Sequence, residues 1–421
     1  MADDIGYECI GVNGSDDYNT PVLDSLSKSG IRFTNAFSQP LCTPSRVKIM
    51  TGKPNYENYK YFGYLGSDQK TFGNLFKENG YKTCIVGKWQ LNGLSYKIKG
   101  YDDNSRPHDF GFDEYSLWQL TLPKNNNKER YSNPLIEQNG NVLKTNASNY
   151  GPDLVSDYAI DFIKRNKDNP FFLYYPMLLV HNPFSPTPDS KDWEFAEKRT
   201  LNNPIYFSDM VNYMDKIIGK IVNELKRNSI LENTLLIFIG DNGTNPKIVS
   251  LNNGIKIKGA KGNTIKYGTN VPMFVNWNSE ISKDFVSNSL IDFTDFYSTF
   301  EDVLKIKNKE SKGISFLKKI KGNKHREREI LSTYYDPRWG SNVNIYRNVY
   351  SQTKKYKLYK SGKFYNIEKD PLERTSLEGL ELDKEIVAIK KLLEMELSKI
   401  PDLQNNSLKL WEKNIKNIGY P

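Results

Sequence analysis

"NTLLIFIGDNG", residues 233–243, is a short apolar run that stops at an acidic residue and an amide. The runs "YKTCIVG" at 81–87 and "PFFLYYPMLLV" at 170–180 have the same character. Apolar runs without polar alternation are typical of strands that are covered on both faces, as in parallel sheets. The sequence therefore predicts a sheet whose central strands are buried on both sides.

Helical patterns lie between these runs. Residues 153–166 and 208–228 carry acidic side chains early and basic ones late, as the helix dipole favours. Strands that alternate with helices predict an α/β domain, which we place at residues 1–319. Tyrosine-rich segments and a further helical pattern follow. They predict a small α+β domain, an antiparallel sheet plus a helix, at residues 320–421.

The composition narrows the class of partner. The chain has 421 residues and a formal net charge of +9, from 59 Lys and Arg against 50 Asp and Glu, and a basic balance favours anionic partners. The basic residues are scattered and form no nucleic-acid-binding motif, so we expect no nucleic acid. The three cysteines show no metal-type spacing. No apolar run approaches the roughly 20 residues that span a bilayer, so we expect no membrane span.

Polar residues directly follow the three apolar runs. Lys88 and Gln90 come after the first, His181 after the second, and Asp241 and Asn242 after the third. In open parallel sheets, ligands bind beyond the carboxyl ends of the strands. We therefore expect a cation, an imidazole and two oxygen ligands to meet at one edge of the sheet.

A second acidic pair, Asp3 and Asp4, lies at the start of the chain. Alone, such a pair is usually solvated, and "GDNG" at 240–243 is usually a turn. Together, Asp3, Asp4, Asp241 and Asn242 offer only oxygen donors, which suits Ca²⁺ or Mg²⁺ and not zinc. The two pairs thus predict a site for one divalent ion.

The stretch "QPLCTPSRVKIMTGK", residues 39–53, reads as the start of a helix. Thr43 is a suitable cap and Pro44 suits the first turn. Cys42 would then lie at the positive end of the helix, where anions bind, and Arg46 is close enough to reach the same anion. The simpler interpretation is a free thiol in front of an ordinary helix, and the spacing alone leaves both open.

These residues resemble a known family. "CTPSR" followed by "VKIMTGK" is similar to the signature of the formylglycine-dependent type I sulfatases, which belong to the alkaline phosphatase superfamily. In that family the cysteine is oxidised to an aldehyde, and the hydrate of this aldehyde is the nucleophile. Further matches follow in family order. They are "ADDIGY", "GKWQL", "GDNG", "GAKGNTIKYGTNVPMFV", "SLIDFTDFYSTF" and "YKLYKSGKFYNIEKDPLERTSL".

The resemblance implies a fold and a set of roles. The fold is alkaline-phosphatase-like, with a mostly parallel central sheet flanked by helices and a small carboxyl-terminal α+β domain. Cys42 would become formylglycine, held by Arg46. Lys88 and Lys261 would contact the sulfate, and His181 with Lys261 would assist the leaving alcohol. The implied ligands of Ca²⁺, or of Mg²⁺, are Asp3, Asp4, Asp241 and Asn242.

Two departures from the family pattern concern the site. Gln90, expected to contact the substrate, stands where the family commonly has a histidine. A glutamine can hold a hydrogen bond but cannot act as a base near neutral pH. Beside Lys261, the residues Lys266, Tyr267 and Asn270 replace Glu, Gly and Arg, which we expect to alter loop packing and not chemistry. Since Lys256 and Lys258 lie nearby, the choice of Lys261 rests on counting from "VP".

The third departure is the start of the chain. In the family, a buried strand of about six residues precedes the first aspartates, whereas only Met1 and Ala2 precede them here. Losing a central strand is costly against a net stability of roughly 5–15 kcal/mol. We therefore expect the native chain to carry this strand. The family is mostly exported, so the resemblance implies a periplasmic or secreted protein, although no export signal is visible in this sequence.

The resulting prediction is a sulfuric ester hydrolase that acts on sulfated carbohydrates. Its expected partner is a maturating enzyme, either a formylglycine-generating or an anaerobic sulfatase-maturating enzyme. One alternative is a phosphodiesterase or phosphonate monoester hydrolase of the same superfamily. A second alternative is a non-catalytic protein that binds sulfated glycans, suggested by Gln90 and the missing strand. Four further side chains either line a sugar-binding cleft or only contribute to packing. They are Trp118, Trp193, Arg338 and Trp339.

Overall fold

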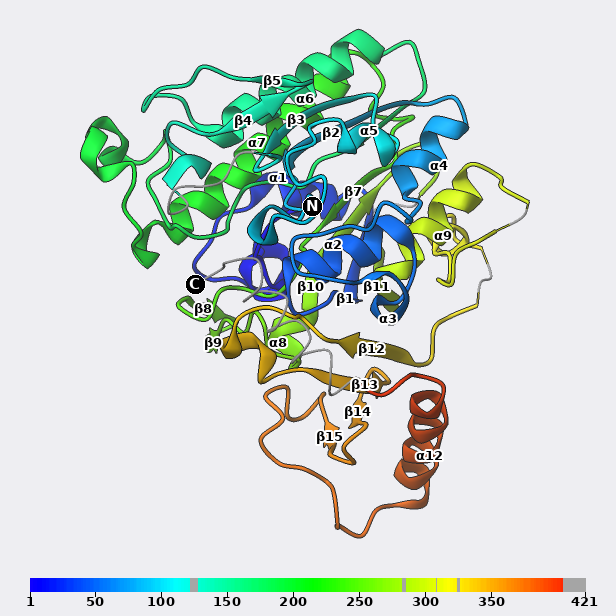
Figure 1. Ribbon diagram of the computed structural model, residues 1–421. Coiled ribbons are helices and arrows are strands. Elements are labelled where there is room, and N and C mark those ends of the chain that lie inside the picture. Colours follow the sequence, from blue (N-terminus) through cyan, green and yellow to red (C-terminus); the bar gives the residue numbers. More distant parts are fainter. Residues whose placement is uncertain (122–127, 282–284, 308, 324–325, 404–421) are drawn as a thin grey trace.

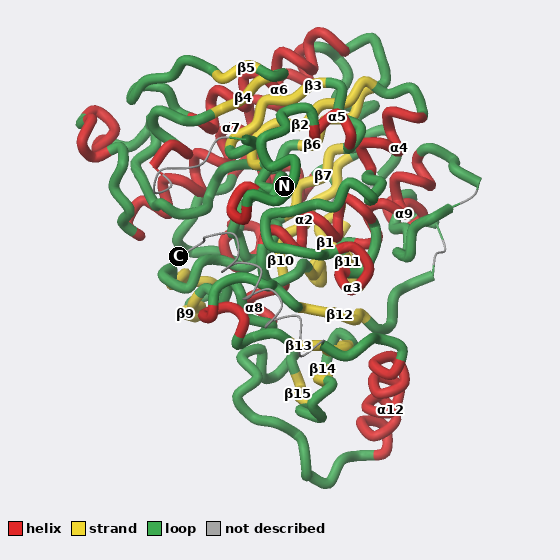
Figure 2. The backbone as a smooth tube through the Cα atoms, in the orientation of Figure 1, coloured by secondary structure: helices red, strands yellow, loops and turns green. Residues whose placement is uncertain are grey.

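The computed structural model describes the chain except for residues 122–127, 282–284, 308, 324–325 and 404–421. Two sheets lie side by side in the large domain (Figures 1 and 2). The first has the order β11, β1, β10, β7, formed by Phe285–Asp292, Ile31–Phe37, Asn270–Asn276 and Leu236–Ile239. The second has the order β5, β4, β3, β2, β6, formed by Asn141–Val142, Ile136–Gln138, Glu114–Trp118, Lys82–Lys88 and Phe171–Tyr174.

Both sheets are covered on both faces, as the apolar runs predict. Along β2, Cys84 and Val86 belong to one hydrophobic core and Ile85 to the other, because successive side chains of a strand point to opposite faces. The first core contains side chains of α1, α6 and α7 (Pro21–Lys28, Gly151–Asn166 and Phe207–Arg227). The second contains those of α2, α4 and α9 (Cys42–Thr51, Phe72–Glu78 and Thr294–Val303). The predicted helices at 153–166 and 208–228 are α6 and α7.

The sheets are mixed, which refines the expectation of a mostly parallel sheet. β2 runs parallel to β3 and β6, and β1 runs parallel to β11. β10 is antiparallel to both β1 and β7. β7 is joined to β10 through the hairpin β8–β9 (Val249–Asn252 and Ile255–Lys258) and the short α8 (Lys266–Thr269). Parallel neighbouring strands need a long crossover connection, usually a helix, and the chain between β7 and β10 does not form one. β10 therefore runs antiparallel to β7.

The first three residues of the chain lie between the two sheets. Ala2 forms a parallel bridge with Gly240 at the end of β7. On the other side, the amino group of Met1 donates to the carbonyl of Tyr175 at 2.8 Å, and Asp3 N donates to the carbonyl of Leu179 at 2.8 Å. The predicted strand at 170–180 is therefore a strand only as far as Tyr174. The rest of this segment runs alongside the first residues of the chain and forms hydrogen bonds with them.

An apolar cavity of about 440 Å³ continues from Met1 between β6 and β7. Each of these strands is the last in its sheet, so among the described residues neither has a strand partner on the side facing the cavity. Phe172, Tyr174, Leu236 and Phe238 line the walls. Burial lowers the pKa of the Met1 amino group to about 5. Two strand edges and an apolar lining thus face this cavity.

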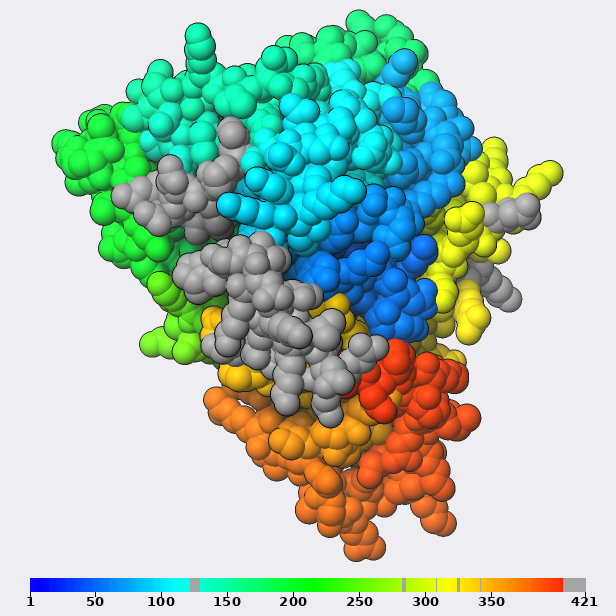
Figure 3. All heavy atoms as spheres, viewed as in Figure 1, coloured from blue at the N-terminus to red at the C-terminus, as the bar shows by residue number. Residues whose placement is uncertain are grey.

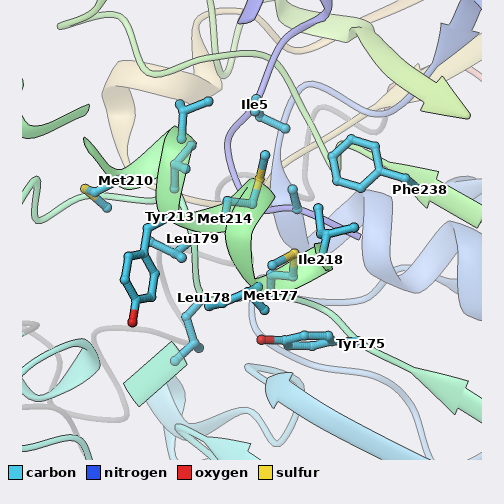
Figure 4. Close-up of a cluster of buried hydrophobic side chains, with 14 of the residues drawn as sticks. Ile5, Tyr175, Met177, Leu178, Leu179, Met210, Tyr213, Met214, Ile218 and Phe238 are labelled. Carbon is cyan, nitrogen blue, oxygen red and sulfur yellow. The ribbon is translucent and has the colours of Figure 1, made fainter. Parts of the chain in front are cut away.

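The side chains of α7 close the core on one side of this region. Met210, Tyr213, Met214 and Ile218 of α7 lie in one cluster of buried side chains with Met177 and Leu178 (Figure 4). All belong to the first hydrophobic core. The start of the chain is therefore anchored to a packed interior even though the neighbouring cavity is open.

The small domain is an antiparallel sheet covered by one helix, as predicted. The sheet has the order β12, β13, β14, β15, formed by Leu331–Tyr335, Asn348–Gln352, Tyr356–Tyr359 and Phe364–Asn366. The helix is α12, Lys384–Ser398, and its Leu393 and Leu397 pack on this sheet. The domain lies at one end of the molecule, drawn in orange and red in Figures 1 and 3. The boundary at residue 319 stays a prediction.

We expect an apolar extension of Met1 to stabilise the protein. Six residues of alternating valine and isoleucine, fused ahead of Met1, should raise the midpoint of thermal unfolding by several degrees, because β6 and β7 both gain a hydrogen-bonding partner and the cavity fills. Calorimetry on this variant and on one with a glycine-serine extension of equal length tests the prediction. Equal midpoints for the two extensions would contradict it.

Candidate active site

The two acidic segments meet because the chain start lies beside the end of β7. Asp241 N donates to the carbonyl of Ala2 at 2.9 Å, and Asp4 N donates to Asp241 Oδ1 at 3.0 Å. Asp3, Asp4, Asp241 and Asn242 are all completely buried. The structure therefore brings together the four oxygen-bearing residues that the sequence predicts as metal ligands.

This cluster holds more acceptor oxygens than the described residues satisfy. Asn242 uses its amide N–H groups on Asp4 Oδ1 and the carbonyl of Gly243, both at 2.9 Å. Its Oδ1 is buried and, within the described part of the chain, receives no hydrogen bond. One ligand-type atom from each of Asp3, Cys42 and Asp241 lies within 4.8 Å of the others. An orphaned buried acceptor among converging oxygens is a site that a hard cation fits.

Electrostatics support the same conclusion. Burial, and then the negative charge of Asp3, raise the pKa of Asp241 to about 7. Burial by itself raises the pKa of Asp3, but the neighbouring cationic side chains, Lys88 foremost among them, together hold this pKa well below its usual range. Asp3 and Asp241 carry like charges close together, so a cation bound by oxygens of both would stabilise the ionised form of Asp241.

Two lysines predicted from the sequence contact these carboxylates. Lys88 Nζ lies 3.0 and 2.8 Å from the two oxygens of Asp3, at the end of β2. Lys261 Nζ lies 2.6 Å from Asp4 Oδ2. Burial by itself lowers the pKa of Lys261, but the acidic groups around it, Asp4 foremost among them, together raise the pKa, so this ammonium stays charged.

Exposure distinguishes Lys261 from the neighbouring lysines. Lys256 and Lys258, on β9, are exposed, whereas Lys261 reaches the carboxylates. Asn270 donates to the carbonyl of Ala36 at 3.1 Å, which ties β10 to β1. That contact is structural, in keeping with the expectation that this departure from the family pattern alters packing.

Cys42 is the first residue of α2, and Leu41 occupies the cap position. The expectation that Thr43 caps this helix is wrong, because Thr43 already lies in the first turn, where its hydroxyl accepts from Gly63 N at 3.2 Å. Ser45 secures the entering chain instead, since its hydroxyl accepts from Gln39 N and donates to the Gln39 carbonyl, both at 3.0 Å. The thiol of Cys42 therefore lies at the positive end of a buried helix.

Arg46 lies one turn beyond Cys42 on the same face of α2. Its Nη2 donates to Asp241 Oδ2 at 3.0 Å and its Nη1 to the carbonyl of Lys88 at 3.1 Å. On the other side of the thiol, Gln90 Oε1 is 3.7 Å from Cys42 Sγ. Position 42 is thus enclosed by a cation and an amide.

His181 presents a neutral imidazole to the site. Its Nδ1 lies 2.5 Å from the carbonyl of Asn182, which can only accept, so Nδ1 carries the proton. Nε2 is left without one, 3.7 Å from Asp4 Oδ2. Burial, and then the charges of Arg130 and Lys261, lower the pKa of His181 well below its usual value.

Sequence reasoning missed Arg130. This residue ends a short 3-10 helix, Lys128–Arg130, and its Nη1 donates to Asp3 Oδ2 at 3.1 Å. The guanidinium lies 4.0 Å from the centre of the Trp118 ring. "KERY" forms no motif and follows no apolar run, so no signal in the sequence points to it.

The aromatic candidates for a sugar-binding cleft differ in burial and in position. Trp118 is buried beneath Arg130, and Trp193 packs edge-on against Tyr150 with ring centres 5.2 Å apart. Both therefore pack the interior. Trp339 is half-buried and stacks on Phe62 at 4.3 Å, beside the group of side chains that contains Cys42.

The small domain reaches the site through Tyr335, the last residue of β12. This ring is completely buried and packs in the same group as Cys42. Its hydroxyl donates to the carbonyl of Gly262 at 3.1 Å, directly after Lys261. Tyr335 therefore links the nucleophile segment to the lysine loop.

Comparison with known proteins gives the family of the chain. A family model described as Sulfatase matches residues 1–306. The chain belongs to the sulfatase family. A second model, described as N-sulphoglucosamine sulphohydrolase, C-terminal, matches residues 264–402. The family predicted from the sequence is confirmed, and it extends over both domains.

Similar proteins include two sulfatases and a solved structure. "Uncharacterized sulfatase YdeN" of Escherichia coli (strain K12) is 29% identical over 357 residues, covering 78% of this chain and 62% of that protein. Human N-acetylgalactosamine-6-sulfatase is 29% identical over 332 residues, covering 71% and 60%. The chain thus spans about three fifths of these relatives. Ps i-CgsB in complex with k-i-k-neocarrahexaose superimposes with a TM-score of 0.76 at 25% identity, covering 100% of this chain and 96% of that one, which confirms the predicted fold.

In the described part of the chain, no helix has the length and apolar character needed to cross a membrane.

Arg46 should be essential to the stability of the site. We expect Arg46→Met to lower the free energy of unfolding by about 3–5 kcal/mol, because it leaves the Asp241 carboxylate buried without its partner. Arg46→Lys keeps the charge but not the two-point contact, so its loss should be smaller. Urea unfolding of both variants measures the difference, and equal losses would rule out this explanation.

Proposed function

We propose that the protein hydrolyses sulfate esters of carbohydrates, with a formylglycine made from Cys42 as nucleophile and with Ca²⁺ as the metal ion. Membership of the sulfatase family supports the reaction class. The observation that carries the proposal is the position of Cys42, whose sulfur lies within 4.8 Å of carboxylate oxygens of Asp3 and Asp241. A residue that is to act beside a metal ion needs that position.

Asp3, Asp4, Asp241 and Asn242 would hold the ion. When bound, the ion supplies positive charge beside the non-bridging oxygens of the ester. The unused Oδ1 of Asn242 and the raised pKa of Asp241 both support cation binding at this place. The all-oxygen set favours Ca²⁺ or Mg²⁺ over softer metals.

The Cys42 sulfur stands in for an oxygen of the hydrated aldehyde. When present, this group supplies one hydroxyl for attack on sulfur and a second that lets the sulfate leave as the aldehyde re-forms. The chain prepares the position in two ways. The amino end of α2 and the guanidinium of Arg46 stabilise negative charge at residue 42, and the amide of Gln90 orients the group.

Lys88 and Lys261 are the groups that would bind the sulfate oxygens. Both now pair with carboxylates, and a metal ion on those carboxylates would free them for an anionic ligand. Lys261 keeps its charge and can donate a hydrogen bond to the departing oxygen. His181, being neutral, must first take up a proton before it can act as an acid.

The experiment starts with the mass of the peptide that contains residue 42. Protein produced with a formylglycine-generating or an anaerobic sulfatase-maturating enzyme should lose about 18 Da there, since CH₂SH becomes CHO. Converted protein should hydrolyse p-nitrophenyl sulfate and sulfated sugars, and folded Cys42→Ala should not. A converted, folded protein that cleaves only aryl phosphate diesters, or that binds sulfated sugars without turnover, would overturn the proposal in favour of one of its two alternatives.

Removing the metal should be visible in stability. A ligand present at 100 times its Kd adds about 2.7 kcal/mol to the free energy of unfolding. We therefore expect CaCl₂ to raise the thermal midpoint of EDTA-treated protein, and Asp241→Asn to abolish this rise. Asp215→Asn, a buried aspartate on α7 outside the site, is the matched control and should keep it. A calcium-dependent rise in Asp241→Asn would place the ion elsewhere.

Gln90 predicts a slow second half of the reaction. A fully effective general base accelerates a reaction step by about 10²–10⁴-fold, and an amide side chain provides none of this acceleration. Gln90→His should therefore raise kcat by about tenfold with little change in kcat/KM, because only the step after sulfate transfer gains. Steady-state kinetics on p-nitrophenyl sulfate measure both. An unchanged kcat would show that another group already serves as the base.

A further inference from the structure

Arg130 is held rigidly at the centre of the site. Its segment lies between β3 and β4, and the guanidinium is completely buried against the face of Trp118. The indole of Trp118 in turn donates to the carbonyl of Glu129 at 3.0 Å. The next residue, Tyr131, donates to the carbonyl of His181 at 2.5 Å. Arg130 is thereby fixed relative to His181.

One whole edge of this guanidinium is without a partner. Nη1 donates to Asp3, but Nε and Nη2 are buried and, among the described residues, have no acceptor. These two nitrogens form the side-on edge of the guanidinium, which matches two oxygens of an oxyanion. Leaving such donors buried and unpaired is costly, so a purely structural role does not explain them.

Arg106 shows what a structural arginine looks like in the same chain. It too is buried, and it lies against the rings of Tyr64 and Phe110. Its Nε donates to Asn92 Oδ1 at 3.2 Å and its Nη2 to the carbonyl of Leu65 at 2.6 Å. The edge that is free in Arg130 is therefore fully used in Arg106.

The position of Arg130 indicates what its free edge binds. Asp3 Oδ2 accepts from Arg130 at 3.1 Å and from Lys88 at 2.8 Å, so both cations converge on one oxygen. Lys88 is the proposed sulfate contact, and Arg130 also lies close enough to His181 to lower its pKa. Arg130 thus stands between the groups assigned to the sulfate and to the leaving alcohol.

The balance of charge also calls for an anion. Arg46, Lys88, Arg130 and Lys261 oppose three carboxylates, which leaves one positive charge in excess. A divalent ion on the carboxylates would add two more. Excess positive charge in a buried site is favourable only when an anionic ligand completes it.

We propose that Arg130 is a further sulfate-binding residue beside Lys88 and Lys261, and that its Nε and Nη2 donate to two oxygens of the substrate's sulfate group. This assignment rests on the proposed sulfatase function. It adds a substrate contact from a segment in which the sequence shows no motif, and it gives a use to the free edge of the guanidinium.

The test compares Arg130→Lys with Arg106→Lys, using inorganic sulfate as the probe. Arg130→Lys keeps the charge but removes the two-nitrogen edge. We expect it to weaken the binding of sulfate, measured by calorimetry in CaCl₂, by about tenfold and to raise KM for p-nitrophenyl sulfate by a similar factor. Arg106→Lys should lose stability and keep the Kd for sulfate. Arg130→Gln, which lacks the charge as well, should bind sulfate more weakly than Arg130→Lys.

Other results would overturn the inference. Folded Arg130→Lys and Arg130→Gln with the wild-type Kd for sulfate would do so. The inference would also be overturned if these substitutions changed only the calcium-induced shift of the thermal midpoint, because Arg130 would then act only on Asp3. Wild-type protein that neither binds sulfate nor turns over sulfate esters would instead refute the proposed function. The two failures are therefore distinguishable.

Discussion

The buried carboxylate of Asp3 is the contact on which the site depends. It receives Lys88 from β2, Arg130 from the segment before β4, and more distantly Arg46 from α2, whose Nη2 is 3.6 Å away. Each of these cations is itself buried, so none could stay in place without a nearby negative charge. One side chain near the start of the chain thus orders groups from three separate elements.

Asp3 owes its position to main-chain pairing and not to its own charge. Its N–H donates to the carbonyl of Leu179, and its carbonyl accepts from Val180 N at 2.7 Å. The Ala2–Gly240 bridge holds the other side. The two sheets are therefore joined at the site by only a few residues, while the apolar cavity separates them farther along. The same short segment therefore contributes both to the stability of the fold and to the assembly of the site.

Much of this arrangement follows from the sequence. Because β2 and β7 are continuous apolar runs, the hydrophobic pattern by itself predicts that Lys88 and Asp241 lie at the carboxyl ends of buried strands, although the structure places these strands in two different sheets. The roles of Cys42 and Lys261 came only from the family resemblance, since spacing alone fitted a free thiol and any of three lysines. Burial in the folded chain is what separates Lys261 from Lys256.

Other features had no local signal. The convergence of Arg130 on Asp3 depends on the packing of Trp118 and on the path of the chain before β4, and neither has a sequence pattern. The mixed direction of the sheet arises from the excursion between β7 and β10, which looks in sequence like an ordinary loop region. The predicted start of α2 lies two residues too late, because Leu41, and not Thr43, occupies the cap position and Ser45 secures the entering chain.

Tyr335 has a consequence for the order of events during synthesis. The site combines Asp3 with a wall beside Cys42, and the side chain that forms this wall, Tyr335, lies more than three hundred residues later in the sequence. Contacts so distant in sequence form late in folding. The side chain of residue 42 is only 2% exposed in the folded chain, so any reagent as large as a protein must reach it before these late contacts form. Access to residue 42 thus ends when Tyr335 packs beside it.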